Sequence, residues 1–174
     1  MITIHAGEEI PKNKKFTIFL AGPTPRSLDV KSWRPDFIKQ LWDNGFNGNI
    51  LTPENREQDS LYDFEKQINW EVNGLETADL IVFWIPRNLE TMPAFTTNIE
   101  FGNYLNSGKI VVGFPEGSPN NRYIKKRCEM NEIPLFHNTD RLCSYVCAYE
   151  KEESKWYNKI RKFQKQVLKA YALN

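Results

Sequence analysis

The segment from Asp79 to Gly113 constrains the fold of this chain more than any other stretch. It holds two continuous apolar runs, Leu80–Ile85 and Lys109–Phe114, without the polar alternation of a half-exposed strand. Such runs are typical of strands in a parallel sheet that is covered on both faces. Between them lie a loop, Arg87–Phe95, and a short helix whose start is indicated by Thr96-Thr97. The segment therefore predicts a strand, a crossover helix and a second parallel strand.

Strands and helices alternate along the rest of the chain. Apolar runs predict further strands at Phe16–Ala21, Asn49–Thr52 and Ile133–Phe136, and Met1–Ala6 alternates in the manner of a short edge strand. Periodicity and capping residues predict helices over 32–44 (capped by Ser32), 64–78 (capped by Asp63), 120–130, and 139 to the end with a break near 150–154.

This alternation predicts one domain over residues 1–174. We expect a three-layer α/β/α sandwich with a five-stranded, mostly parallel sheet in the order 2-1-3-4-5, counted from Phe16–Ala21. That order places the ends of the strands at Ala21 and Pro86 side by side, where ligands gather in open α/β sheets. The charged loop Glu54–Ser60 is a candidate lid over that region.

The charge balance and the cysteines narrow the class of protein. The 23 basic and 22 acidic residues nearly cancel, so no overall field favours polymeric nucleic acid or a membrane. No apolar run reaches the roughly 18 residues of a membrane span, and the N-terminus lacks the order of a signal peptide. Three cysteines without suitably spaced histidines predict free thiols in a cytoplasmic protein, with no metal site and no cofactor.

The C-terminal segment, 152–174, reads as a basic amphipathic helix. Its apolar positions recur at helical spacing: Trp156, Ile160, Phe163, Val167 and Tyr171. Such a helix suits a membrane surface or nucleic acid, but more often its stripe packs on its own sheet or on a twin subunit, and we favour that interpretation.

Two acidic residues stand out near the predicted strand ends. Glu71 falls within the apolar arc of its helix, beside Ile68 and Leu75, where a carboxylate is costly unless it is paired or faces a cavity. Burial would raise its pKa toward the range of a general acid. The alternative is a glutamate at the edge of the arc that reaches solvent or bonds a backbone group. Glu100 lies in the first turns of its helix, whose dipole favours the ionised form. The alternative there is a capping box, Thr97-x-x-Glu100.

Paired carboxylates are the equipment of glycosidic bond cleavage. One attacks or stabilises the anomeric centre, and the other handles the proton of the leaving group. The dinucleotide-binding, phosphate-loop, serine-hydrolase and zinc-peptidase motifs are absent from the sequence.

Four stretches resemble the nucleoside 2-deoxyribosyltransferase-like family. They are IFLAGPTPR (18–26), SWRPDF (32–37), INWEVNGLETADLIVFWIPRN (68–88) and AFTTNIEFGNYLNSGKIVVGFPEGS (94–118), within a match from Phe16 to about Arg127. The resemblance implies a flavodoxin-like fold and double displacement at the anomeric carbon of a nucleoside. It implies that Glu100, in the E-F-G motif, is the nucleophile. It also implies that Glu71 protonates the departing base, at a position where better-studied transferases carry aspartate.

The resemblance also implies a substrate-binding loop. Gly22 and Pro23 correspond to the segment that lies against the substrate, and Thr24 and Arg26 match by position. Asn98 is expected to reach a sugar hydroxyl, and Arg87 with Arg26 to favour a nucleotide at the mouth. A further family aspartate before the nucleophile has no clear match, the nearest acid being Glu90.

The function hypothesis is transfer of a 2-deoxyribosyl group between nucleobases through a covalent glycosyl-glutamate. The partners expected are a nucleoside or nucleotide, a nucleobase, and further copies of the chain in a homo-oligomer. Two alternatives stay open: an N-glycosidase with water as acceptor, and a non-catalytic nucleotide sensor or interaction protein.

Overall fold

The computed structural model describes residues 1–27, 29–56 and 63–171, with side chains described up to residue 155. Six strands form one sheet in the order β1-β3-β2-β4-β5-β6, and every neighbouring pair is parallel. The strands are β1 (Ile2–His5), β2 (Thr17–Ala21), β3 (Asn49–Thr52), β4 (Leu80–Trp84), β5 (Ile110–Gly113) and β6 (Leu135–Phe136). The five predicted strands lie in the predicted order. The count of five is wrong by one strand, because the N-terminal segment joins the sheet beside β3.

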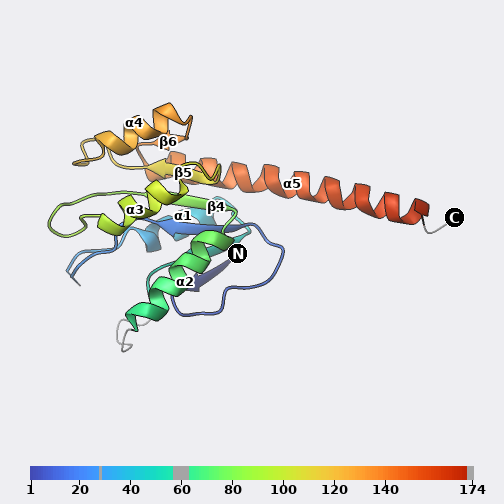
Figure 1. Cartoon of the computed structure of the whole chain (residues 1–174), viewed down its shortest axis with the longest axis horizontal. Helices are drawn as coiled ribbons and strands as arrows, with labels where there is room; N and C mark the ends of the chain where they lie inside the picture. Colours follow the sequence, from blue (N-terminus) through green and yellow to red (C-terminus); the bar gives the residue numbers. More distant parts are fainter. Residues whose placement is uncertain (28, 57–62, 172–174) are drawn as a thin grey trace.

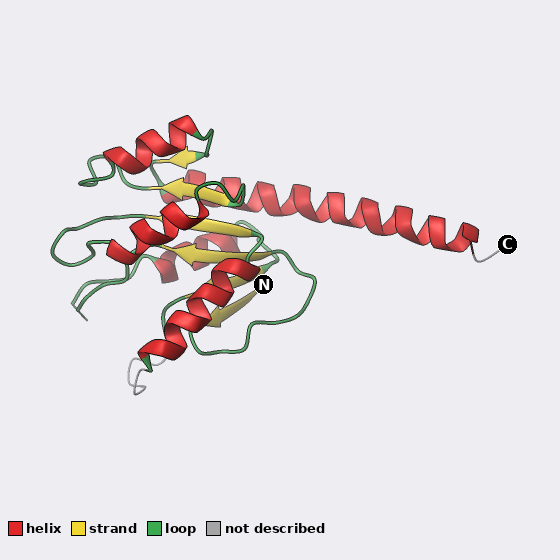
Figure 2. Ribbon diagram, viewed as in Figure 1, coloured by secondary structure: helices red, strands yellow, loops and turns green. Residues whose placement is uncertain are grey.

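In the described part of the chain, five helices cover the two faces of the sheet, which confirms the three-layer flavodoxin-like class (Figure 2). One face packs on α2 (Phe64–Thr77), α3 (Phe95–Tyr104) and α4 (Arg122–Met130), the other on α1 (Arg34–Asp43) and the start of α5 (Thr139–Tyr171). Alternate strand residues serve the two layers. In β2, Phe19 joins the first core, and Ile18 and Leu20 join the second. Both faces are apolar, so the strands read as continuous apolar runs.

The last helix, α5, is one continuous element through Tyr171, and the predicted break near 150–154 does not occur. Its first turns are buried against the sheet through Leu142, Cys143 and Val146, and the helix then leaves the body of the protein (Figure 1). The apolar stripe predicted from Trp156 to Tyr171 lies outside the residues whose side chains are described. In the described ranges, no helix is long and apolar enough to span a membrane.

Helix ends show which capping predictions hold. Asp63 caps α2 as predicted, because its carboxylate accepts a hydrogen bond from the Lys66 backbone N–H at 3.2 Å. The helix α1 begins at Arg34 with Trp33 at the cap position, one residue later than predicted, and the Ser32 hydroxyl accepts a hydrogen bond from the Arg34 backbone N–H at 3.2 Å. At the other end of α2, the Lys109 ammonium donates to three backbone carbonyls, of residues 75, 76 and 78, at 2.8–2.9 Å. A cation there complements the helix dipole.

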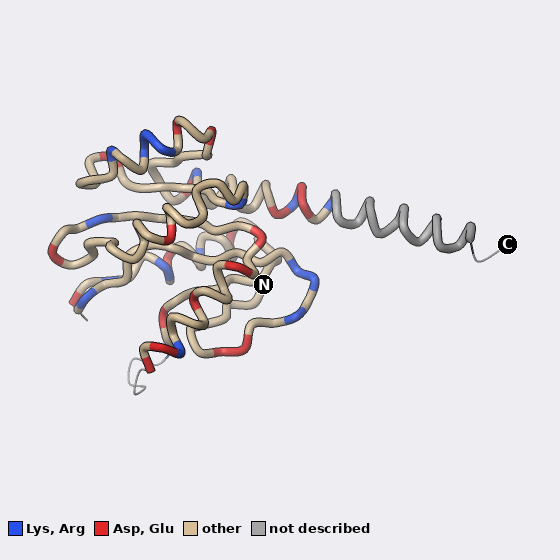
Figure 3. The backbone as a smooth tube through the Cα atoms, in the orientation of Figure 1, with Lys and Arg blue, Asp and Glu red and all other residues tan. Residues whose placement is uncertain are grey.

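Charged side chains of both signs are interspersed along the described backbone, as the near-zero net charge leads one to expect (Figure 3). Cys128, Cys143 and Cys147 are free and buried.

Candidate active site

A cleft opens at the carboxyl ends of β2 and β4, the two central strands of the sheet. The chain connections from these two strands run toward opposite edges of the sheet. Parallel α/β sheets bind ligands at such a switch point. The cleft has a volume of about 680 Å³. Its walls come from the segment after β2, from α2 and from α3. The lining includes Ala21, Gly22, Pro23, Thr24, Arg26, Gln67, Glu71, Glu100 and Tyr104.

Glu71 and Glu100 both line this cleft, one from α2 and one from α3. The capping-box alternative for Glu100 is wrong. The α3 helix begins at Phe95, after Ala94 in the left-handed conformation (φ 61°), so Thr97 lies inside the helix and caps nothing. Glu100 therefore stands in the second turn with its side chain in the cleft wall. Glu71 is half-buried in the cleft wall, as expected of a carboxylate that faces a cavity.

The charge of Glu71 affects the protonation of Glu100. Burial, and then the charge of Glu71, raise the pKa of Glu100 to about 7, while the Arg34 guanidinium acts in the opposite direction. This direction is contrary to the one expected from the helix dipole, because the loss of water around the carboxylate outweighs the dipole. Burial also raises the pKa of Glu71, against a hydrogen bond from the Gln67 amide and the charge of Arg34. The pKa values of both groups are thus raised toward the range in which a side chain can act as acid and base at neutral pH.

The segment after β2 is shaped by a glycine that no other residue can replace. Gly22 has φ +149°, and a Cβ atom built there would lie 2.2 Å from the backbone oxygen of Trp84 and 2.9 Å from the Trp33 ring. Such a close approach of backbone to backbone needs glycine. The chain continues through buried Pro23 to Thr24, which is exposed on the cleft wall.

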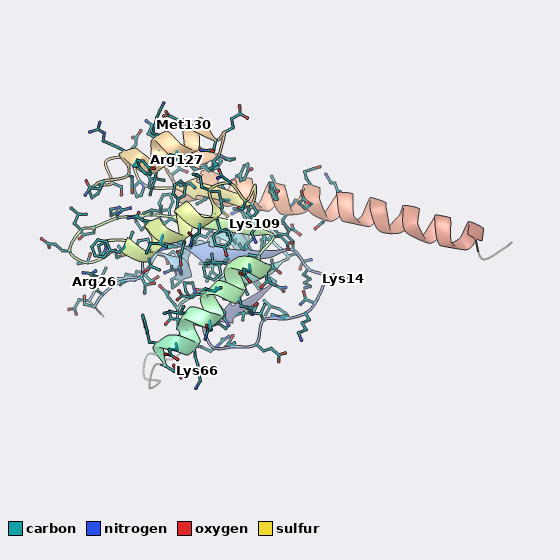
Figure 4. The ribbon with its side chains drawn as sticks, viewed as in Figure 1. Lys14, Arg26, Lys66, Lys109, Arg127 and Met130 are labelled. Carbon is teal, nitrogen blue, oxygen red and sulfur yellow. The ribbon has the colours of Figure 1, made fainter. Side chains whose placement is uncertain are left out.

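Arg26 lies at the edge of the cleft and connects two of its walls. Its guanidinium carbon lies 5.4 Å from the ring centroid of Phe95, the first residue of α3. Its backbone N–H donates to the Thr91 carbonyl at 3.0 Å, which joins the segment after β2 to the loop after β4. Figure 4 shows Arg26 at the strand ends that carry the cleft and Lys109 at the other end of the sheet.

Arg87 and Asn98 are not among the described residues that line the cleft. Arg87 is buried, and its guanidinium donates to the Pro93 carbonyl (2.8 Å), the Asn98 amide oxygen (2.6 Å) and the Asn121 amide oxygen (3.1 Å). These bonds brace the loop that leads into α3, and they engage the one side-chain oxygen of Asn98. Glu90, on the same loop, is exposed and is not part of the cleft wall.

Two residues of the site were missed by the sequence analysis. Gln67 lies one turn before Glu71 on α2 and hydrogen-bonds it. Arg34 is completely buried at the start of α1 and contacts the segment after β2. Its spacing carried a usable signal, because Arg34, Phe37 and Leu41 share the buried face of their helix. A charged residue on an apolar face was the same signal that identified Glu71. Part of the predicted lid, 57–60, lies outside the described residues.

Comparisons with known proteins place this chain in a family. A search of curated proteins finds no match. One solved structure that resembles the chain is a conserved protein from Enterococcus faecalis V583, at 16% sequence identity and a TM-score of 0.46, over 75% of this chain and 87% of that one. The family model described as nucleoside 2-deoxyribosyltransferase like matches residues 15–118, well over half of the chain and every cleft residue named above. The chain therefore belongs to the nucleoside 2-deoxyribosyltransferase-like family.

Proposed function

We propose that the protein transfers a 2-deoxyribosyl group between nucleobases by double displacement, with Glu100 as nucleophile and Glu71 as general acid and base. The observation that carries the proposal is the pair itself. Two carboxyl groups from different helices line one cleft, and burial raises the pKa of each toward neutral pH. Membership of a family of nucleoside 2-deoxyribosyltransferase-like proteins, which act on small nucleosides and nucleobases, supplies the substrate class.

In the first half-reaction a carboxylate oxygen of Glu100 forms a bond to C1′ as the bond from C1′ to the base nitrogen breaks. The electron pair of that bond goes to the base, and Glu71 supplies the proton that neutralises it. In the second half-reaction a nitrogen of the incoming base attacks C1′ from the face that the first base left. Its proton passes to Glu71, and the carboxylate of Glu100 is released. Two displacements at one carbon retain the configuration.

This chemistry needs one proton shared by the two carboxyl groups, on Glu71 at the moment of attack. Two like charges in one desolvated cleft resist simultaneous ionisation, so the pair holds a proton at a pH where isolated carboxyl groups would have lost theirs. With its pKa near 7, Glu100 is ionised in about half of the molecules at neutral pH.

The outer part of the cleft offers a surface for the flat base. Exposed apolar side chains flank it on α2 and α3: Phe64, Ile68, Val72, Phe95 and Ile99. Aromatic and aliphatic side chains of this kind pack well on a planar ring, and the few polar groups of the inner cleft would fix its orientation.

Incubation with deoxyinosine, with and without added adenine, tests the proposal. New deoxyadenosine is the expected product. Free deoxyribose alone, with or without adenine, would identify a hydrolase that uses water in the second step. Tight binding without either product would identify a nucleotide-binding protein.

The roles of the two glutamates are tested separately. Glu100→Gln is expected to abolish formation of the glycosyl-enzyme, and wild-type turnover in this variant would rule out Glu100 as nucleophile. Glu71→Gln is expected to slow the reaction less for nucleosides whose base leaves easily, because such bases need no proton from the enzyme. Equal slowing for good and poor leaving groups would contradict the acid role.

A further inference from the structure

Arg34 holds the wall of the cleft through an unusual number of bonds for one side chain. Its guanidinium donates to the backbone carbonyls of Gly22 (2.6 Å), Leu20 (3.2 Å) and Pro23 (3.4 Å), and to the Thr24 hydroxyl at 3.1 Å. All four acceptors belong to the end of β2 and the segment after it. Arg34 comes from α1, on the opposite face of the sheet from the two helices that carry the glutamates.

The charge of Arg34 is matched by one carboxylate. Glu54, two residues after the end of β3, accepts from the Arg34 guanidinium at 2.8 Å and from the Ser32 hydroxyl at 2.6 Å. The Arg34 side chain is 1% exposed and that of Glu54 is 19% exposed. Replacing a buried ion pair by well-packed apolar side chains is often neutral or stabilising, so stability alone does not account for such a pair. The bonds of Arg34 to Gly22 and Thr24, which line the cleft with the glutamates, point to a functional reason.

Arg34 also acts on the two glutamates of the cleft. Its positive charge lowers the pKa of both Glu100 and Glu71, in opposition to burial. Other charged or titratable side chains that line the cleft are Arg26, Glu76 and Tyr104, and the pKa of Tyr104 is raised by burial and by the charges of Glu76 and Glu100. Among the described residues, Arg34 is the cation whose charge is felt at both carboxyl groups, and Glu54 partly neutralises it.

We propose that Arg34 is a positioning residue of the active site, which holds the cleft wall against the sugar and supplies the positive charge that allows one glutamate to ionise beside the other. Glu54 tunes that charge from the far side of the guanidinium. The catalytic part of this proposal rests on the proposed function, whereas its electrostatic part can be measured without turnover.

Two variants of the ion pair are expected to change the pKa of Glu100 in opposite directions. Arg34→Met removes the cation at similar volume, so the pKa of Glu100 should rise by about one unit. Glu54→Gln keeps an oxygen that accepts the same hydrogen bonds but removes the neutralising charge, so the pKa of Glu100 should fall by roughly half a unit. A merely structural support would not produce shifts of opposite sign.

The measurement is a titration of the Glu100 carboxyl carbon by NMR in ¹³C-glutamate-labelled protein, assigned with Glu100→Gln. Opposite shifts support the proposal, and no shift or shifts of one sign overturn it. If Arg34→Met does not fold by circular dichroism, Glu54→Gln alone decides, because an unchanged titration in that variant also overturns the proposal.

Kinetics at pH 7 separate the charge of Arg34 from its hydrogen bonds. Loss of ionised Glu100 alone should lower kcat/KM of Arg34→Met about fivefold. Arg34→Lys keeps the charge but loses the planar guanidinium that donates several hydrogen bonds. The pH profile of this variant should therefore match that of wild type, while its kcat/KM should be lower than that of wild type. Wild-type kcat/KM in Arg34→Lys would overturn the positioning role. If wild-type protein cleaves no nucleoside, the proposed function fails, and the titrations still decide the electrostatic claim.

Discussion

Replacing Glu100 by glutamine tests, without any substrate, whether the cleft holds this carboxyl group at the expense of stability. The pKa of Glu100 lies at about 7 in the folded protein, against 4.5 for an unperturbed glutamate. A carboxyl group with a raised pKa binds more protons in the folded state than in the unfolded state. The free energy of unfolding therefore falls as the pH rises through the window between these two values.

The size of the effect follows from the two pKa values. A difference of about 2.5, at about 1.4 kcal/mol for each unit, corresponds to about 3 kcal/mol. At pH 8 we expect Glu100→Gln to be more stable than wild type by about this amount, because the variant buries no charge. In a domain of this length that is roughly 6 to 12 °C in Tm. Near pH 4 wild-type Glu100 is protonated in both states, so the difference should vanish.

Urea unfolding followed by circular dichroism at pH 8 and pH 4 measures the two differences. Glu90→Gln, which removes an equal charge from an exposed position, is the matched control and should change stability by less than about 0.5 kcal/mol at either pH. A Glu100→Gln variant that is destabilised at pH 8, or equally affected at both values, would refute the reasoning about the buried pair.

Three further variants address other parts of the site. Glu71→Gln removes the like charge beside Glu100, so the pKa of Glu100 should fall in a ¹³C titration of its carboxyl carbon, and an unchanged titration would disprove the coupling. Gly22→Ala forces a methyl group to 2.2 Å from a backbone oxygen and should lower stability by well over the roughly 1 kcal/mol expected of Gly45→Ala, where φ is +77° but space is open. Equal urea midpoints for the two alanine variants would contradict the close approach. Lys109→Met leaves three carbonyls at the end of α2 without a charged donor, so the free energy of unfolding in urea should fall by about 2 kcal/mol. An unchanged free energy of unfolding would contradict this role of Lys109.

Much of the fold could be predicted because the four inner strands, β2 to β5, are buried on both faces. The continuous run at Leu80–Trp84 has no polar alternation, and parallel crossovers then leave few strand orders. The edge strand Ile2–His5 was harder to assign, since its residues are only partly buried and its pattern resembles that of a solvated segment. The predicted helix starts were inaccurate where tertiary contacts determine where a helix begins. The start of α3 follows a left-handed Ala94 beside Pro93, whose carbonyl is bonded to Arg87, and the threonine signals nearby were misleading.

Site residues could be predicted where helical periodicity places a charged residue on an apolar face. They could not be predicted where their role depends on the direction in which the side chain points. Glu71 could be found because a carboxylate on an apolar arc has few explanations. The raised pKa of Glu100 could not, because it depends on how far two helices enclose the carboxyl group. Arg87 follows a strand end, as a ligand-binding residue would, yet it turns back into the loop. Nothing in the local sequence distinguishes the two directions.

The all-parallel order of the sheet has a consequence for how the protein folds. The strands that carry the cleft, β2 and β4, are joined at their start by a bond from the Thr17 N–H to the Asp79 carboxylate, 62 residues away. Pairings of this kind must close long loops before they gain contacts, so sheets of parallel strands fold slowly. Because the cleft lies at the ends of these two central strands, it can form only once they have paired. We therefore expect variants that disturb this pairing to lower the yield of folded protein, while the molecules that do fold keep the specific activity of wild type.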